Sequence, residues 1–327
     1  MSDAATITEI PYVGDELELF SHALNWKSYL RRQISPFLGK RVLEVGAGIG
    51  ATTRMLCDGT QENWRCLEPD LPMARLLETQ ILNGELPACC QAQAGTVADV
   101  DEQFDSLIYI DVLEHIPADR EEIALAAEKV RPGGFIVVLS PAHNHLYTAF
   151  DKRIGHCRRY SKEMLAELTT PMLSIERLRY LDCVGYFASL ANRLMLRQSM
   201  PTLNQIRLWD GLMVPLSKLF DPLLRYKAGK SVLCIWRKEA EPVPPVEPPT
   251  PGRRLARMFG LVSLTTLFAI AALLVLAARE GGVPNGPGFR RRVRPAFQIT
   301  PPAAIAFGAV AGAVTFHLLT RQRGRRP

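Results

Sequence analysis

A glycine-rich turn between an apolar strand and a helix constrains the fold of this chain most. The segment reads Glu44-Val-Gly46-Ala47-Gly48-Ile-Gly50. Glycines at such a turn let the backbone take positive φ angles and approach a ligand closely. The next predicted strand ends at Glu68, 22 residues after Gly46, where a carboxylate can bind two ribose hydroxyls. The sequence therefore places a ligand crevice at the carboxyl ends of these strands.

The spacing of the glycines favours one kind of ligand. A dinucleotide site wants a Gly-x-Gly-x-x-Gly/Ala register with a pyrophosphate at the start of the helix. Gly-x-Gly-x-Gly preceded by an acid fits a nucleoside without phosphates better. The alternative is a structural turn in an α/β protein that binds no nucleotide.

Strands and helices alternate over the following hundred residues, which predicts an α/β fold with a mostly parallel sheet covered on both faces. Two later strand-like segments, 172–181 and 231–236, could pair at one edge of that sheet. An amphipathic helix over 15–33 leads into the fold, Asp70 can cap the helix that follows it, and Ser161 can cap another. The apolar runs expected to form the main strands are 41–45, 64–70, 88–94, 104–111 and 135–140.

The charge is divided unevenly along the chain. The 39 Lys and Arg exceed the 33 Asp and Glu by six. Residues 241–327 alone hold twelve Arg and three Glu, so the first 240 residues carry a net charge of −3. A mildly acidic body without a base-flipping motif argues against a nucleic acid partner. The seven scattered Cys residues lack a C-x-x-C pair and predict reduced thiols, with no disulfide framework and no metal site.

The C-terminal part predicts a membrane anchor. Residues 239–257 form a proline-rich, basic linker, and 258–278 follow with 21 uncharged residues, enough to cross the hydrocarbon core as a helix. A buried core helix is the alternative. A second candidate span, 303–319, is shorter and could instead lie at the interface. Arginines flank both segments and weakly favour a hairpin with both ends in the cytoplasm.

Four motifs in order resemble the class I S-adenosylmethionine-dependent methyltransferases: VLEVGAGIG, LEPD, DSLIYIDVLEHI and VRPGGFIVVLSP. The likeness spans roughly 25–180 and implies a Rossmann-like, seven-stranded, mostly parallel sheet with helices on both faces. It also implies S-adenosyl-L-methionine as cofactor. The domain would cover 41–238, after a helical lead-in over 1–40 and before the linker and the transmembrane helices. The residues that the resemblance places at the cofactor are Glu44, Gly46, Ala47, Gly48, Gly50, Glu68, Pro69, Gly95, Thr96, Asp111 and Val112. The acid expected near the adenine is absent at Gly95-Thr96, and Asp99 or Asp101 could supply it.

Candidate catalytic residues follow the fourth and fifth predicted strands. Asp111 should face the sulfonium and the acceptor, although it could also cap a helix. An acceptor hydroxyl needs a base, and the candidates are His115, His143, His145 and His156. The LEHI segment around His115 resembles quinone-biosynthesis O-methyltransferases, but that ring could equally be a packing residue. His143 lies where acceptors enter.

The segment Asp151–Tyr160 concentrates hydrogen-bond donors beside the predicted acceptor crevice and resembles that of a bacterial type-12-like methyltransferase subgroup. One interpretation is a clamp for an anionic acceptor; the other is a solvated basic turn paired with Asp151. The helical stretch 182–230 could be a lid over the acceptor or ordinary core. The candidate acceptor-binding residues are Tyr147, Arg153, His156, Arg158, Arg159 and Tyr160.

Together these features predict a methyltransferase tethered to the membrane, with its catalytic domain facing the cytoplasm, where the cofactor is made. The expected acceptor is an oxygen of an anionic lipid-linked, glycolipid or quinone-type molecule at the bilayer surface. One alternative is an anchored methyltransferase acting on a soluble small molecule or protein. Another is a membrane adaptor that binds the cofactor without turnover.

Overall fold

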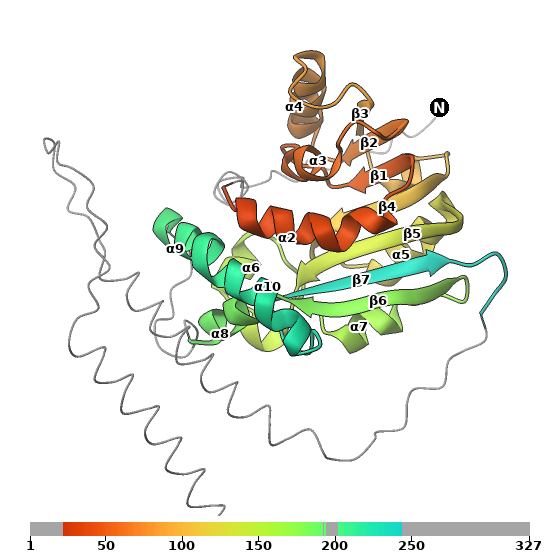
Figure 1. Ribbon diagram of the computed structural model, residues 1–327. Coiled ribbons are helices and arrows are strands. Elements are labelled where there is room, and N and C mark those ends of the chain that lie inside the picture. The colour runs from red at the N-terminus through yellow and green to blue at the C-terminus, as the bar shows by residue number, and fades with distance from the viewer. Residues whose placement is uncertain (1–21, 192, 194–201, 244–327) are drawn as a thin grey trace, which may run out of the picture. The chain divides into compact units, whose positions relative to one another are not determined.

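A seven-stranded sheet organises the part of the chain that the computed structural model describes, residues 22–191, 193 and 202–243 (Figure 1). The strand order is β3-β2-β1-β4-β5-β7-β6. Strands β1 to β5 pair parallel, and β7 pairs antiparallel with both β5 and β6, so β6 runs in the same direction as the first five. The strands are β1 (Arg41–Val45), β2 (Asn63–Glu68), β3 (Cys90–Ala94), β4 (Phe104–Ile110), β5 (Val130–Pro141), β6 (Leu173–Leu181) and β7 (Ser231–Lys238).

The predicted α/β sheet is confirmed, including the pairing of the two late segments at one edge, where β6 is the outermost strand. One strand starts earlier than expected. Strand β5 begins at Val130, which pairs with Phe104 across an irregularity in the register, and not at residue 135. The helix before it ends at Lys129.

Helices cover both faces of the sheet because successive strand residues point to opposite sides. Val42 belongs to the core beneath one layer of helices and Leu43 to the core beneath the other. Figure 1 shows helices α2 and α10 lying across one face and α5 behind the sheet. The first face is covered by α2 (Leu24–Ile34), α3 (Ala51–Leu56), α4 (Leu71–Leu82), α8 (Cys183–Ala191), α9 (Leu203–Leu208) and α10 (Val214–Leu223). The second face is covered by α5 (Asp119–Lys129) and α7 (Lys162–Glu167).

Two predicted helix caps are confirmed. The Asp70 carboxylate accepts from the Met73 N–H, 2.9 Å away, at the start of α4. The Ser161 hydroxyl accepts from the Met164 N–H at 3.2 Å at the start of α7. Both side chains satisfy N–H groups that the first turn of a helix leaves unpaired.

The helices between β6 and β7 form a layer with the lead-in helix α2. The Asp210 carboxylate, from the π-helix η6 (Trp209–Met213), accepts from the backbone N–H groups of Asn25 and Trp26 at 3.0 and 2.8 Å. Asp210 thus caps α2 from a distant part of the chain. Most of the aromatic and aliphatic side chains of this layer pack into the core, with Phe187, Trp209 and Met213 buried.

The membrane predictions concern residues beyond this fold. Within the described ranges 22–191, 193 and 202–243, no helix has both the length and the apolar character needed to cross a bilayer. The predicted spans 258–278 and 303–319 and most of the linker lie outside the described residues, as do residues 15–21 of the predicted lead-in helix.

Candidate active site

The glycine-rich loop joins β1 to α3 in the predicted conformation. Gly46, Gly48 and Gly50 have φ angles of 67°, 55° and 74°. The N–H groups of Gly46 and Ala47 both donate to the Leu67 carbonyl, at 2.8 and 3.1 Å. A Cβ at Gly46 would lie 2.7 Å from a methyl group of Val112, so no larger residue fits there without displacing the segment after β4.

Glu68, at the end of β2, faces this loop. Its Oε2 accepts from the Gly48 N–H at 2.8 Å, and its Oε1 accepts from the Asp70 N–H at 3.0 Å. Each carboxylate oxygen keeps one further lone pair, so Glu68 can still accept from two hydroxyl groups. Two neighbouring hydroxyl groups of a ribose could donate to these two oxygens. Burial raises the pKa of Glu68, and Pro69 beside it is exposed.

Glu44 supports the loop from beneath. It is 2% exposed, and its Oε2 accepts from the Thr53 hydroxyl and from the Trp64 ring N–H, each at 2.7 Å. Its Oε1 is buried without a hydrogen-bond partner. Burial raises the pKa of this carboxyl to about 7. The structure therefore places Glu44 where it fixes α3 to β2 beneath the glycines.

Gly95 and Thr96 lie beside Glu68, since the Gly95 N–H donates to the Glu68 carbonyl at 3.1 Å. Asp99 does not stand free for an adenine. Its Oδ2 accepts from the N–H and the hydroxyl of Thr96, at 2.8 and 2.9 Å, and these bonds lower its pKa. The other candidate acid, Asp101, is exposed.

Asp111 follows β4 and turns its backbone into the left-handed region, with φ at 55°. Its N–H donates to the Leu139 carbonyl of β5 at 2.9 Å. The residue as a whole is exposed, while burial of its carboxyl raises its pKa to about 6 against the nearby charge of Lys230. Lys230 was missed by the sequence analysis. It precedes β7, whose antiparallel direction brings its amino end to the carboxyl edge of β5.

Beside Asp111 lies a second carboxylate that the sequence analysis did not single out. Glu114 is wholly buried, and neither of its carboxylate oxygens has a hydrogen-bond partner. Burial and the nearby charge of Asp111 raise its pKa well above the usual range. Glu114 Oε1 lies 3.8 Å from His156 Nε2. The protonated carboxyl is thus the form that this position favours.

His156 connects Glu114 to a charged pair. Its Nδ1 lies 3.1 Å from Asp151 Oδ1, and Asp151 also accepts from two nitrogens of Arg159, at 2.7 and 3.0 Å. Burial would raise the pKa of Asp151, but the bonds from His156 and Arg159 outweigh it and hold that pKa well below its usual value. An ionised Asp151 fixes the proton of His156 on Nδ1 and leaves Nε2 toward Glu114. His115 packs edge-on against His156, with ring centroids 4.6 Å apart, and burial lowers its pKa to about 4.

The predicted acceptor clamp is engaged within the protein. The Arg158 guanidinium pairs with Asp119 and donates to the Pro117 carbonyl, and the Tyr160 hydroxyl donates to the same Asp119 at 2.7 Å. Arg159 is likewise paired with Asp151, so both guanidinium groups have partners within the protein. The Tyr147 hydroxyl donates to the His156 carbonyl at 2.6 Å, and the Arg153 guanidinium lies over the Phe150 ring.

His143 is held at the end of β5. Its φ angle is 68°, and its ring packs against Tyr180 and Tyr186, with centroids 4.5 and 5.0 Å away. Nε2 lies 3.1 Å from the Gly229 carbonyl, next to Lys230. Burial lowers the pKa of His143 to about 4. The ring is neutral at physiological pH, so Nε2 carries the proton that the carbonyl accepts.

Residues 43–138 match a family model described as a methyltransferase domain. The central strands of this chain are thus similar to a methyltransferase domain. The match supports the expected methyltransferase, and S-adenosylmethionine is the cofactor, as the sequence predicted. The loop of Gly46, the acceptor oxygens of Glu68 and the segment from Asp111 to Val112 are the parts of the domain that would hold it.

Solved structures with a similar fold include two that are named as methyltransferases and one whose name states no activity. Geranyl diphosphate methyltransferase in complex with SAM is 12% identical, with 72% of this chain and 95% of that one covered and a TM-score of 0.48. Coclaurine N-methyltransferase bound to N-methylheliamine and SAH is 12% identical, with 66% and 72% covered and a TM-score of 0.47. The YcgJ protein from Bacillus subtilis is 13% identical, with 67% and 99% covered and a TM-score of 0.42. No curated protein sequence matches the chain.

Proposed function

We propose that the methyltransferase domain methylates an oxygen atom of its acceptor and that Asp111 accepts the proton this oxygen loses. The observation that carries the proposal is the position of Asp111. Asp111 is an exposed residue that follows the strand next to the glycine-rich loop, and burial of its carboxyl raises its pKa to about 6. A base with a pKa near neutrality is ionised at physiological pH and still strong enough to take a proton.

The reaction needs little beyond alignment and a base. When bound, the cofactor supplies an electrophilic methyl group on a sulfonium. The acceptor oxygen gains this methyl group and gives its proton to Asp111. The nearby positive charge of Lys230 favours the ionised form of Asp111. Burial lowers the pKa values of His115 and His143 to about 4, so both are weaker bases than Asp111.

The proposal places the acceptor at a bilayer surface, as a lipid-linked, glycolipid or quinone-type molecule. One layer of the domain supports it, because three of its leucines are exposed: Leu24 of α2 by 70%, and Leu219 and Leu223 of α10 by 61% and 70%. Helices α2 and α10 are in contact, and Arg32 and Lys218 are close enough to repel each other. Exposed leucines beside basic side chains suit an anionic lipid surface.

The uncharged segment 258–278 and its flanking arginines support anchoring from outside the described residues. We place the domain on the cytoplasmic side, because an enzyme that uses S-adenosylmethionine must reach the compartment where that cofactor is made. The anionic clamp is left out of the proposal, since Arg158 and Arg159 are paired with Asp119 and Asp151.

The test follows a labelled methyl group. The full chain in detergent is incubated with methyl-labelled S-adenosylmethionine and either lipid or soluble extracts of cells that lack the protein. We expect label in the lipid fraction as an alkali-stable ether or a labile ester, and its loss with Asp111→Asn. Asp58→Asn, an exposed carboxylate at the other edge of the sheet, is the matched control. Label in soluble molecules alone would show a soluble acceptor. Cofactor binding without any transfer would show an adaptor.

A further inference from the structure

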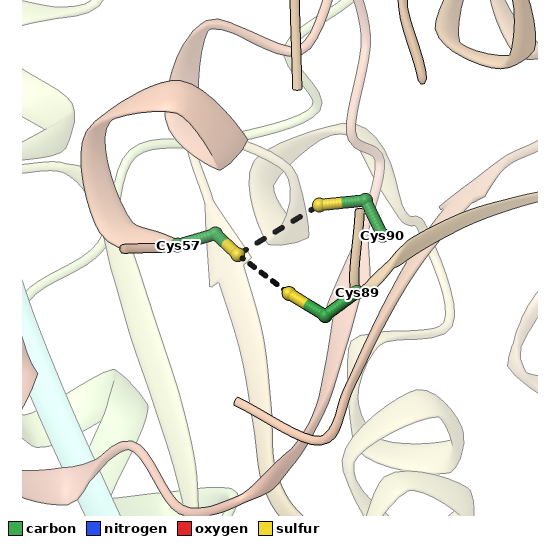
Figure 2. A group of neighbouring side chains, drawn as sticks. All are labelled: Cys57, Cys89 and Cys90. Carbon is green, nitrogen blue, oxygen red and sulfur yellow. Dashed lines mark hydrogen bonds between the residues drawn. The ribbon is translucent and has the colours of Figure 1, made fainter. Parts of the chain in front are cut away.

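Three cysteine side chains converge at the amino ends of β2 and β3, at the edge of the sheet opposite the cofactor crevice. Figure 2 shows Cys57, which follows the last residue of α3, pointing at Cys89 and Cys90, where β3 begins. Cys57 Sγ lies 3.5 Å from Cys89 Sγ and 3.7 Å from Cys90 Sγ. All three sulfur atoms lie within 4.8 Å of one another.

We propose that Cys57, Cys89 and Cys90 bind one thiophilic metal ion of the zinc class. Two thiolates bound to the same Zn²⁺, with Zn–S bonds of about 2.3 Å and tetrahedral angles, lie about 3.8 Å apart. The two measured separations of 3.5 and 3.7 Å are close to that value. A disulfide needs the sulfur atoms about 2.05 Å apart. It would also leave the third thiol unused, and all three cysteines are free.

Backbone hydrogen bonds hold the main chain at the three cysteines. The Cys57 N–H donates to the Thr53 carbonyl in the last turn of α3, and the Cys90 N–H donates to the Pro87 carbonyl, each at 2.9 Å. The Cys89 carbonyl accepts from the Trp64 N–H of β2, also at 2.9 Å. Ligands held on a helix end and a strand start give a metal site its geometry without rearrangement of the chain.

The exposure of the three side chains gives the ion an entry path. Cys57 and Cys90 are 5% and 3% exposed, whereas Cys89 is only partly buried. An ion can therefore approach past Cys89 and bind against the two buried thiols, with a water molecule or an external thiol as its fourth ligand. Thiolates are soft ligands, and three of them select zinc-class ions over magnesium or calcium.

The ion would stabilise helix α3, which lies between the metal site and the glycine-rich loop. Helix α3 is six residues long and joins Gly50 of the glycine-rich loop to Cys57. A metal that ties Cys57 to the start of β3 closes the far end of this helix onto the sheet. The inference does not depend on the acceptor or on methyl transfer.

The test titrates the full chain in detergent, reduced and freed of metal with a chelator, with Cd²⁺ alone. Cadmium bound to thiolates absorbs in the ultraviolet, which reports sulfur ligands directly. We expect one Cd²⁺ per chain with this absorption, and a loss of affinity of more than about 100-fold for Cys57→Ser and for Cys89→Ser, beyond what a lost outer-shell partner costs. Cys157→Ser controls for an exposed thiol elsewhere. His156→Gln controls for the Glu114, His115 and His156 side chains, which also lie within 4.8 Å of one another.

Circular dichroism shows whether each variant is folded, so that a lost affinity is not mistaken for a lost fold. Cys89→Ser is the safer variant, because its side chain is only partly buried. If this folded variant kept both the absorption and the affinity, the proposal would be wrong. It would also be wrong if the native chain bound no Cd²⁺, or if Cys57 and Cys89 formed a disulfide in the protein isolated without reductant.

Discussion

Asp111 combines an unusual backbone with an unusual carboxyl. A φ angle of 55° costs an L-residue on the order of 1–2 kcal/mol. The bond from its N–H to the Leu139 carbonyl holds the backbone in place. Strain of this kind concentrates at functional sites, where the surrounding structure imposes it.

The pKa of Asp111 leads to a prediction for catalysis. A base must be ionised to accept a proton, so kcat/KM for methyl transfer should rise with pH through about 6 and then level off. Asp111→Asn should lower kcat/KM by about 10²- to 10⁴-fold, the usual contribution of a general base, and should remove the acid limb of the profile. The measurement is the initial rate of methyl transfer over pH 5–9, with methyl-labelled S-adenosylmethionine as donor and the lipid fraction as acceptor. A variant that kept the acid limb would assign it to another group.

Glu44 gives a prediction for stability. Its pKa is near 7 in the fold and near 4.5 when unfolded, so the folded state binds more protons over that interval. Stability should therefore fall as the pH rises from about 4.5 to 7, by up to about 3 kcal/mol at 1.36 kcal/mol per pKa unit. Glu44→Gln should flatten this dependence. Denaturation of both chains at pH 5 and pH 8 measures it, and an equal drop in both would exclude Glu44 as the cause.

For single residues, the sequence predicted which ones lie at the crevice better than it predicted which side chains contact one another there. The glycines and Glu68 occur in a local pattern whose spacing predicts their positions. No local pattern predicts the partners of Arg158 and Arg159. Asp119 lies 39 residues from Arg158, and nothing local distinguishes a paired arginine from one that waits for an anion. Lys230 and Glu114 were missed for the same reason, because the approach of distant segments defines their surroundings.

Among the elements, α2 depends on a cap that comes from another part of the chain. Its first turn has no side-chain cap of its own, and Asp210 supplies one from the π-helix. Sequence reasoning found the helix from its periodicity, but could not find a cap about 185 residues away. The sequence also did not predict that the three cysteines converge, because Cys57 and Cys89 are 32 residues apart and belong to no compact motif.

Removing this cap should loosen one layer of the fold. Asp210→Ala leaves two N–H groups of α2 unpaired and should lower the free energy of unfolding by about 1–2 kcal/mol, as other lost helix caps do. Hydrogen exchange should speed up at Asn25 and Trp26 while α5, on the other face, stays protected. Asp101→Ala, an exposed carboxylate outside this layer, is the control. Equal exchange in both variants would contradict the assignment.

At the scale of the whole molecule, the charges separate into an acidic body and a basic C-terminal part. The alternation of strands and helices was enough to predict the sheet, since parallel strands need covered crossovers. How the helices after β6 pack was not predictable, because core and lid surfaces share the same apolar spacing. The structure places most of these side chains in the core.

Anchoring predicts how the chain behaves with vesicles. The full chain should float with vesicles of neutral lipid at any salt concentration. A chain ending at Val243 should float only with anionic vesicles and should be released as salt rises from 10 to 150 mM, where the screening length falls from about 30 to 8 Å. Leu219→Ser in the shortened chain should weaken this residual binding further. A full chain that stayed with the soluble fraction would contradict the anchor.

The antiparallel direction of β7 also decides where the chain leaves the domain. Because β7 runs against β5, its last residue, Lys238, lies at the amino edge of the sheet, away from the cofactor crevice. A linker to a bilayer would therefore begin on the side of the domain opposite the cofactor crevice. The fourteen residues 244–257 can extend at most about 50 Å, close to the ~45 Å width of a domain of this size. A linker of this length would just allow the crevice to face a membrane in which residues 258–278 were inserted. Shortening it by half should therefore stop methylation of a lipid and leave cofactor binding unchanged.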